Sequence, residues 1–109
     1  MSRGILATCY ATIKENISDD MIDAAFTKMY GSEKFIRLLG RNAYPETKFV
    51  RGSNYCDIGW HIDERTHRVI ILSAIDNLVK GAAGQAVQNF NIAAGFYESI
   101  ALDVVPFYP

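Results

Sequence analysis

The chain begins with a segment in which side chains alternate regularly between two faces. Between Gly4 and Lys14, five apolar positions (Ile5, Ala7, Cys9, Ala11 and Ile13) alternate with four others (Leu6, Thr8, Tyr10 and Thr12). A period of two residues predicts a β-strand. Because both faces are apolar or hydroxylic, we expect an interior strand that is covered on both sides.

The next segment predicts an α-helix that follows Ser18 and ends at Gly31. The Ser18 hydroxyl is suited to accept a bond from an unpaired backbone N–H, so Ser18 is the expected N-cap. Asp19 and Asp20 lie in the first turn, where the helix dipole favours negative charge. Gly31 is expected to end the helix as a C′ residue. The buried stripe should contain Met21, Ile22, Ala25, Phe26 and Met29.

The middle of the chain predicts further strands at 35–39, 55–62 and 69–75, a loop at 40–47, and another short strand at 48–51. The polar residues 63–67 separate two of these strands and predict a hairpin turn. The strand at 69–75 is apolar on both faces, which indicates a central position in the sheet.

Asp76 or Asn77 is expected to cap a second helix that continues to about Ala94 and is stopped by Gly95. Its interior contains Gly81 and Gly84, and each interior glycine costs about 1 kcal/mol relative to alanine. Glycine allows another backbone or a flat ligand to approach closely, which would explain the cost. The tail from residue 96 to 109 is expected to form a final strand or a docked extension. The order of elements predicts an α+β fold in a single domain, 1–109.

Composition narrows the possible partners. The 109 residues carry 11 basic and 12 acidic side chains, a formal net charge of −1, which argues against nucleic-acid binding. No apolar run approaches the roughly 18 residues of a membrane-spanning helix, and the first residues do not resemble a signal peptide. Two cysteines without a framework spacing indicate a reducing compartment, and we expect a cytoplasmic protein.

Few residues suggest chemistry by themselves. We expect Cys9 to be a buried structural residue because it lies in the middle of a strand. Cys56 and His61 fall on opposite faces of one strand, so they are not expected to form a thiol–imidazole pair. No spacing typical of a metal site or of a Gly-rich phosphate loop is present. An independent thiol enzyme using Cys56 or Cys9 remains an alternative. Arg3, just before the first strand, is able to bind an anion in bidentate fashion.

Three stretches together carry a family resemblance: RGILATCYA at 3–11, RGSNYCDIGWHIDERTHRVIIL at 51–72, and SAIDNLVKGAAGQAVQNFN at 73–91. They resemble the C-terminal portion of N-acetyl-gamma-glutamyl-phosphate reductase. Aspartate-semialdehyde dehydrogenase is a weaker relative, with a similar Asp-Asn-Leu…Gly-Ala-Ala element.

The resemblance implies a mixed, mainly antiparallel sheet with two main helices, as in part of the C-terminal domain of glyceraldehyde-phosphate-dehydrogenase-like enzymes. It also implies an NADP-dependent oxidoreductase of arginine biosynthesis that converts N-acetyl-glutamyl phosphate to the semialdehyde. The Rossmann domain, catalytic cysteine and catalytic histidine of that family would all precede Met1. Cys9-Tyr10-Ala11-Thr12 imitates the end of the nucleophile motif but lacks its preceding Pro-Gly. The isolated chain is therefore expected to be inactive and not to bind NADP alone.

Three residues match functional positions of the family. Asn77 matches an asparagine that approaches the nicotinamide carboxamide, although it could also serve as a helix N-cap. Gly81 would allow the helix to pack against the Rossmann domain and cofactor. Arg3 matches an arginine that binds an anionic group of the substrate. The resemblance gives no catalytic or metal-binding residue in this chain.

The expected partners follow from the same resemblance. We expect a homo-oligomer and, in the full-length enzyme, a small-molecule substrate, with no nucleic acid and no membrane. Alternatives are a non-enzymatic dimerisation or assembly module, and a fragment of the related aspartate-semialdehyde dehydrogenase.

Overall fold

The computed structural model describes residues 2–107. Its elements are β1 (Ile5–Thr12), α1 (Asp19–Tyr30), β2 (Ile36–Arg41), the 3-10 helix η1 (Thr47–Phe49), β3 (Cys56–Asp63), β4 (Arg68–Ile75), the π-helical turn η2 (Val79–Ala83) and α2 (Gly84–Ala93). No helix in the described part of the chain has the length and apolar character needed to cross a membrane.

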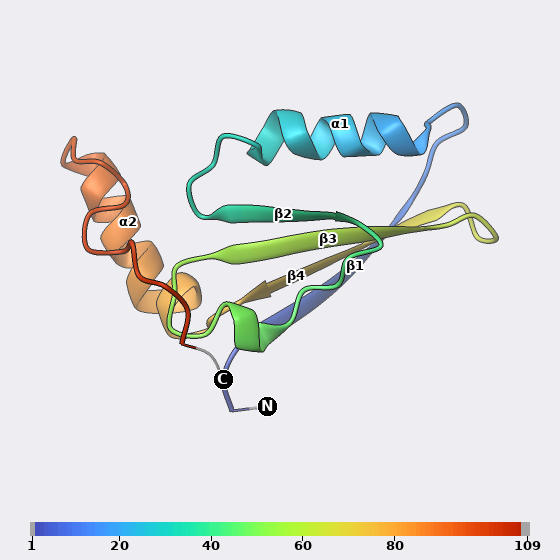
Figure 1. The fold of residues 1–109 in the computed structure, drawn as a ribbon. Helices are drawn as coiled ribbons and strands as arrows, with labels where there is room; N and C mark the ends of the chain where they lie inside the picture. The colour runs from blue at the N-terminus through green and yellow to red at the C-terminus, as the bar shows by residue number, and fades with distance from the viewer. Residues whose placement is uncertain (1, 108–109) are drawn as a thin grey trace.

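The four strands form one sheet in the order β1-β4-β3-β2. β3 and β4 form the predicted hairpin, and β1 pairs with β4, both in antiparallel fashion. β2 instead runs parallel to β3. The predicted α+β fold, with a mixed, mainly antiparallel sheet and two main helices, is confirmed (Figure 1). β4 has the central position that its two apolar faces predicted.

The prediction that the first strand is an interior strand covered on both sides is wrong. β1 lies at the edge of the sheet and, within residues 2–107, pairs only with β4. Leu6 and Tyr10 on one face are 48% and 65% exposed, and Ile5 on the other is 46% exposed. Its apolar pattern was interpreted as burial, but every residue of β1 except the half-buried Ala7 is exposed.

The predicted first helix is present, with a different C-terminal geometry. Ser18 is the N-cap, and its hydroxyl accepts a hydrogen bond from the Met21 N–H at 3.3 Å. Gly31 follows the helix, but its φ of −63° is right-handed, so it is not the left-handed C′ residue that we predicted. Its N–H bonds the Thr27 carbonyl, as in a continuing helical turn.

α1 packs on one face of the sheet through part of the predicted stripe. Ile22, Phe26 and Tyr30 lie against the buried cluster of Ile58, Trp60 and Val69. The Phe26 and Trp60 rings stack with centroids 4.3 Å apart. Ala25, Met21 and Met29 were also predicted to be buried but are exposed, Met21 by 52% and Met29 by 66%.

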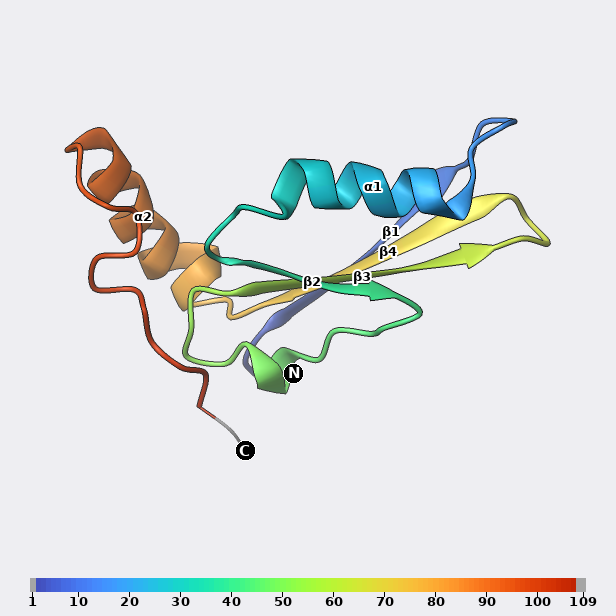
Figure 2. The same cartoon turned by 45° about the horizontal axis from the view of Figure 1, so that its top comes forward.

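The connection from β2 to β3 crosses the opposite face of the sheet from α1 (Figure 2). β2 extends through Gly40, a position predicted as loop, with a register shift beside it. Residues 48–51 are not the predicted strand, because the 3-10 helix η1 occupies this region. A Cβ at Gly59 would clash with the Ala43 carbonyl oxygen, so glycine lets this connection approach β3 closely.

The second helix begins with wider turns than predicted. In η2 the Gly81 N–H bonds the Asp76 carbonyl and the Ala83 N–H bonds the Leu78 carbonyl, which are five-residue steps. α2 then ends near Gly95, whose φ is +75°. Among the described residues the tail forms a docked extension rather than a strand, and the Phe107 N–H bonds the Arg51 carbonyl at 2.8 Å. The last two residues of the predicted tail, 108 and 109, lie outside the described range.

Candidate functional site

Asp76 joins three separate parts of the chain where β4 ends. Its side chain is fully buried. Oδ1 accepts hydrogen bonds from the N–H groups of Leu78 at 2.8 Å and Val79 at 3.1 Å. Oδ2 accepts bonds from the Gly52 N–H at 2.7 Å and from Arg3 Nη2 at 2.5 Å. One carboxylate therefore fixes the start of η2, the loop before β3 and the N-terminal segment. We call these five residues the Asp76 cluster.

The electrostatics of the cluster favour the ionised carboxylate. Burial by itself would raise the pKa of Asp76, but the hydrogen bonds from Gly52, Leu78, Arg3 and Val79 outweigh it and lower the pKa to about 2. Hydrogen bonds donated to a carboxylate stabilise its charged form. Asp76 is thus an anion at every pH near neutrality.

Arg3 reaches the cluster from just before β1, although it is 73 positions away from Asp76 in the sequence. Its side chain is about one-third exposed. Nη2 is bonded to Asp76, whereas Nε is buried and has no hydrogen-bond partner within residues 2–107. An unpaired buried donor is costly, so the guanidinium has unused capacity for an acceptor.

Asn77 is held beside the same cluster. Its Oδ1 accepts a hydrogen bond from the Gly4 N–H at 2.8 Å, which ties the start of β1 to the end of β4. Of the two predicted caps, Asp76 rather than Asn77 serves this role, because the Asp76 side chain bonds the first N–H groups of the helical segment. The Asn77 NH₂ group makes no hydrogen bond to the described residues.

The two helix glycines differ in their surroundings. Gly81 is exposed, and an added Cβ would lie 3.3 Å from the Asp76 carbonyl oxygen and 3.5 Å from Ile75. Gly84 is buried, and an added Cβ would overlap Asn54 Oδ1 and lie 2.8 Å from Val79. Of the two glycines, Gly81 therefore leaves room for another backbone or a ligand to approach, whereas Gly84 is required by packing within this chain.

A buried polar network supports this end of the molecule. The Gln88 Oε1 accepts bonds from Asn54 Nδ2 at 3.0 Å and Lys80 Nζ at 2.8 Å, and Gln88 Nε2 donates to Glu98 at 2.8 Å. Burial lowers the pKa of Lys80, although the charges of Cys56 and Glu98 oppose this effect. The network holds the tail against α2 and fixes the position of Gly84.

The cysteines do not form a catalytic group with the described residues. Cys9 is exposed on β1, so the prediction that it is buried is wrong. Cys56 is half-buried against the core, and burial raises its pKa, although Lys80 opposes this shift. His61 Nδ1 lies 2.7 Å from Asn42 Oδ1 and is not paired with a thiol. No group of three or more His, Cys, Asp or Glu side chains within residues 2–107 is arranged to bind a metal ion.

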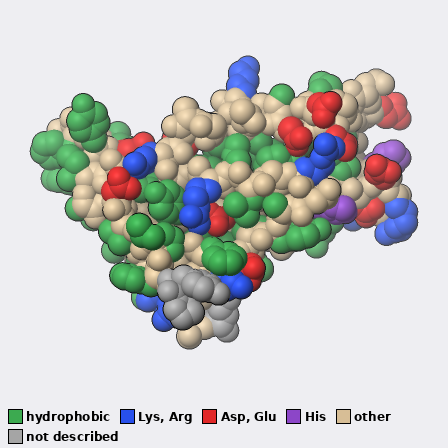
Figure 3. Space-filling view, viewed as in Figure 1, with side chains coloured by type: hydrophobic (Ala, Val, Ile, Leu, Met, Phe, Trp, Pro, Cys, Tyr) green, Lys and Arg blue, Asp and Glu red, His purple; other side chains and the backbone are tan. Residues whose placement is uncertain are grey.

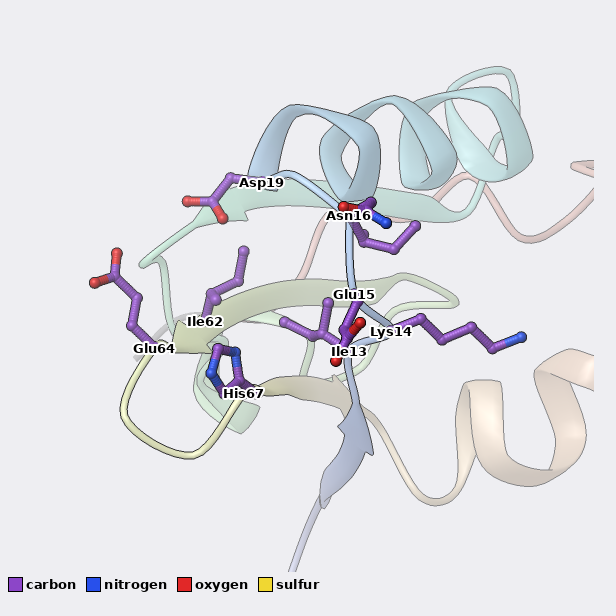
Figure 4. A pocket seen from close by; sticks show the side chains of 9 residues that line it. Ile13, Lys14, Glu15, Asn16, Asp19, Ile62, Glu64 and His67 are labelled. Carbon is purple, nitrogen blue, oxygen red and sulfur yellow. The ribbon is translucent and has the colours of Figure 1, made fainter.

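A surface hollow of about 830 Å³ lies at the other end of the sheet, between the β3–β4 turn and the β1–α1 connection (Figure 4). Asp19, Glu64 and His67 are among the residues that line it. The hollow is not lined by Arg3, Asn77 or Gly81. Arg3 instead belongs to the Asp76 cluster, Asn77 follows Asp76 in the chain, and the Gly81 N–H bonds the Asp76 carbonyl.

Sequence reasoning proposed Arg3, Asn77 and Gly81 as site residues but did not predict most of the contacts between these segments. It named Asp76 only as a possible helix cap and gave Gly52 no role. An aspartate before a helical segment is a local signal for the first function. The bonds to Arg3 and Gly52 join distant positions and have no local signature.

Comparison with known proteins gives the family context. The family described as "Semialdehyde dehydrogenase, dimerisation domain" matches residues 1–77. N-acetyl-gamma-glutamyl-phosphate reductase from Desulfotalea psychrophila is 54% identical over 109 residues, which are 100% of this chain and 32% of that protein. The reductase from Alkaliphilus metalliredigens is 51% identical with the same coverage. The chain thus spans about a third of the length of these relatives.

Solved structures agree on the fold. A crystal structure of aspartate semialdehyde dehydrogenase II from Vibrio cholerae, complexed with ASA, has a TM-score of 0.65 and 19% sequence identity. The match covers 87% of this chain and 28% of that one. At this identity it supports the fold alone. Because the family match extends over most of the chain, the protein belongs to the semialdehyde dehydrogenase dimerisation-domain family.

Proposed function

We propose that this chain is the C-terminal part of an N-acetyl-gamma-glutamyl-phosphate reductase, an NADP-dependent oxidoreductase of arginine biosynthesis in the cytoplasm. Relatives with this name are about half identical over the whole chain. The observation that carries the proposal is the Asp76 cluster, which brings Arg3 beside Asn77. These residues match the substrate-facing and cofactor-facing positions of the family.

The chain would contribute binding and orientation rather than a nucleophile. Arg3 would bind an anionic group of the substrate, and its unpaired Nε fits this role. The Asn77 NH₂ group would donate to the nicotinamide carboxamide, because its oxygen is already bonded to Gly4. Gly81, exposed beside Asn77, would allow close approach of the cofactor. NADPH would supply the hydride, and the residues that form the thioester would lie in the preceding part of the full-length enzyme.

The exposed apolar surface of α2 supports the proposal that another domain of the full-length enzyme covers this helix. Val87 and Phe90, three residues apart on one side of α2, are 37% and 64% exposed. The Phe96 ring of the tail lies with its centroid 6.4 Å from that of Phe90, and Tyr97 beside it is 85% exposed. Hydrophobic side chains gather at this end of the molecule (Figure 3). A large exposed apolar patch usually marks an interface. We assign it to the nucleotide-binding domain of the full-length enzyme.

The open face of the sheet supports homo-oligomer formation. Leu6 and Tyr10 of β1 share this face with Ile70 and Leu72 of β4, because Tyr10 pairs with Ile70 and Thr8 pairs with Leu72. The connection that carries η1 lies against β3 at Gly59 and, through Thr47, against Gly4 just before β1. We propose that a second copy of the chain packs here. An assembly role without catalysis would need this surface but not the Asp76 cluster.

The reductase proposal is tested by joining this chain to the remaining two-thirds of the Desulfotalea psychrophila reductase. We expect NADPH formation from the semialdehyde, phosphate and NADP⁺, and we expect none from the 109 residues alone. Asn77→Ala should raise the KM for NADP⁺ about tenfold, the effect of one lost hydrogen bond of roughly 1.4 kcal/mol. An inactive fusion that is folded and contains the nucleophile would overturn the proposal.

The oligomer is tested by sedimentation of the chain. Tyr10→Arg should shift the mass toward the monomer, because it places a charge in the proposed interface. Met29→Arg is the matched control, since Met29 is 66% exposed on α1, on the other side of the sheet. Dissociation by Met29→Arg instead of Tyr10→Arg would contradict this assignment.

A further inference from the structure

The two oxygens of Asp76 hold two different halves of the proposed site. Oδ2 bonds Arg3 and Gly52, on the side assigned to the substrate. Oδ1 bonds the N–H groups of Leu78 and Val79, which follow Asn77 on the side assigned to the nicotinamide. Because one planar carboxylate makes all four bonds, it fixes the position of Arg3 relative to the Asn77 segment.

We propose that Asp76 is a positioning residue of the reductase, whose carboxylate sets where Arg3 meets the substrate anion relative to the turn that carries Asn77 and Gly81. This inference rests on the proposed function and adds to it a residue that the family resemblance does not assign. Asp76 acts through Arg3 and through the η2 backbone, and its buried carboxylate touches neither ligand.

The burial of the cluster separates this role from direct binding. The Asp76 side chain has no exposed surface, whereas that of Arg3 is 35% exposed. Four donors occupy the carboxylate, so little capacity remains for a ligand. Three of these donors are backbone N–H groups with fixed positions. Arg3 is the only partner that is able to move, and its orientation is therefore the property that the carboxylate controls.

The loop that carries Gly52 is held in place by the C-terminal tail. Gly52 has a φ of +76°, and an added Cβ there would overlap the Phe107 ring. The neighbouring Arg51 carbonyl accepts the Phe107 N–H. The docked tail therefore keeps the Gly52 N–H aimed at Asp76, which leaves Arg3 as the adjustable member of the cluster.

The Asp76→Asn variant separates the two halves. It has the same shape but replaces one carboxylate oxygen with an NH₂ group. The remaining oxygen should face Leu78 and Val79, whose backbone donors cannot turn away. The NH₂ group then faces the donors of Gly52 and Arg3, and the partly exposed Arg3 side chain moves outward. The helix start is kept while the substrate side loses its orientation.

Steady-state kinetics of the full-length fusion enzyme test this inference, with semialdehyde, phosphate and NADP⁺ as reactants. Asp76→Asn should raise the KM for the semialdehyde or for phosphate by about 10- to 100-fold, as expected for a weakened charge-assisted contact of about 1.5–3 kcal/mol. The KM for NADP⁺ should stay within about twofold. Arg3→Gln should reproduce this pattern, and the double variant should lose no more than Arg3→Gln alone.

Asp57→Asn is the matched control. Asp57 is 2% exposed and bonds Arg37 at 2.6 Å, so this variant also breaks a buried ion pair. It should lower stability and leave all three KM values unchanged. If Asp76→Asn does not fold, Arg3→Lys should retain more substrate affinity than Arg3→Gln, because a lysine still pairs with Asp76.

The outcomes separate the proposed function from the positioning role. An inactive unsubstituted fusion counts against the reductase proposal itself. An active fusion in which Asp76→Asn raises every KM equally, or lowers only stability as Asp57→Asn does, overturns the positioning role. Additive losses of Arg3→Gln and Asp76→Asn would also overturn it.

Discussion

Replacing Gly84 with alanine should destabilise the fold, although the same change three residues earlier should not. Gly84 is buried, and its Cα faces Asn54 Oδ1 and Val79. A methyl group there would overlap the Asn54 oxygen. Asn54 cannot easily move away, because its Nδ2 donates to Gln88 within the buried network. Gly81 is exposed, and a methyl group would meet its neighbours at 3.3–3.7 Å.

The expected magnitudes follow from two opposing effects. Overpacking a filled interior costs about 1–3 kcal/mol, and alanine regains about 1 kcal/mol of helix propensity over glycine. Gly84→Ala should therefore lower the free energy of unfolding by up to about 2 kcal/mol. For Gly81→Ala the small strain and the propensity gain nearly cancel, so we expect a change within about 0.5 kcal/mol.

Urea unfolding of the two variants, followed by circular dichroism, measures this difference. In thermal unfolding, each kcal/mol of lost stability should lower Tm by about 4–8 °C in a domain of this size. A stabilised Gly84→Ala variant would refute the packing argument. Equal losses in both variants would also refute it, since they would indicate that the helix tolerates alanine at neither position for a reason unrelated to Asn54.

Two further predictions concern titration and thiol reactivity. The pKa of Asp76 is lowered to about 2, so its carboxylate should stabilise the fold by roughly 2 kcal/mol above about pH 4 and lose this contribution as the pH falls toward 2. The free energies of unfolding of the chain and of Asp76→Asn should therefore converge near pH 2. A constant difference between the two at every pH would contradict this role of the carboxylate. Cys9 is exposed, whereas Cys56 is half-buried and has a raised pKa. Iodoacetamide at pH 8 should therefore label Cys9 at least about tenfold faster than Cys56. Preferential labelling of Cys56 would instead support a reactive thiol there.

Local patterns predicted the elements that depend on local interactions. Alternation located the β3–β4 hairpin, since side chains in a strand repeat every two residues and a polar turn separates the two strands. Ser18 was identified because an N-cap bonds its own helix. The interior position of β1 was not predictable in the same way, because burial depends on which segments cover a strand and not on the strand alone.

The candidate site shows the same limit. Asn77, Gly81 and Arg3 were proposed as site residues through the family resemblance alone. The Asp76 carboxylate joins residues that are 73 and 24 positions away from it, and no sequence period encodes such contacts. Gly84 was interpreted together with Gly81 as a docking surface, yet its neighbour Asn54 lies in a distant loop. Such pairings exist only after the chain has folded.

Hydrogen exchange of residues 78–94 tests whether a nucleotide-binding domain covers this helix. It should be measured in the 109-residue chain and in the full-length fusion enzyme. Its surface at Gly81, Phe90 and Ile92 is exposed in the chain. We expect amide protection at least about tenfold higher in the full-length enzyme, because covered helices open less often. Equal protection in a strictly monomeric chain would contradict the proposed docking surface.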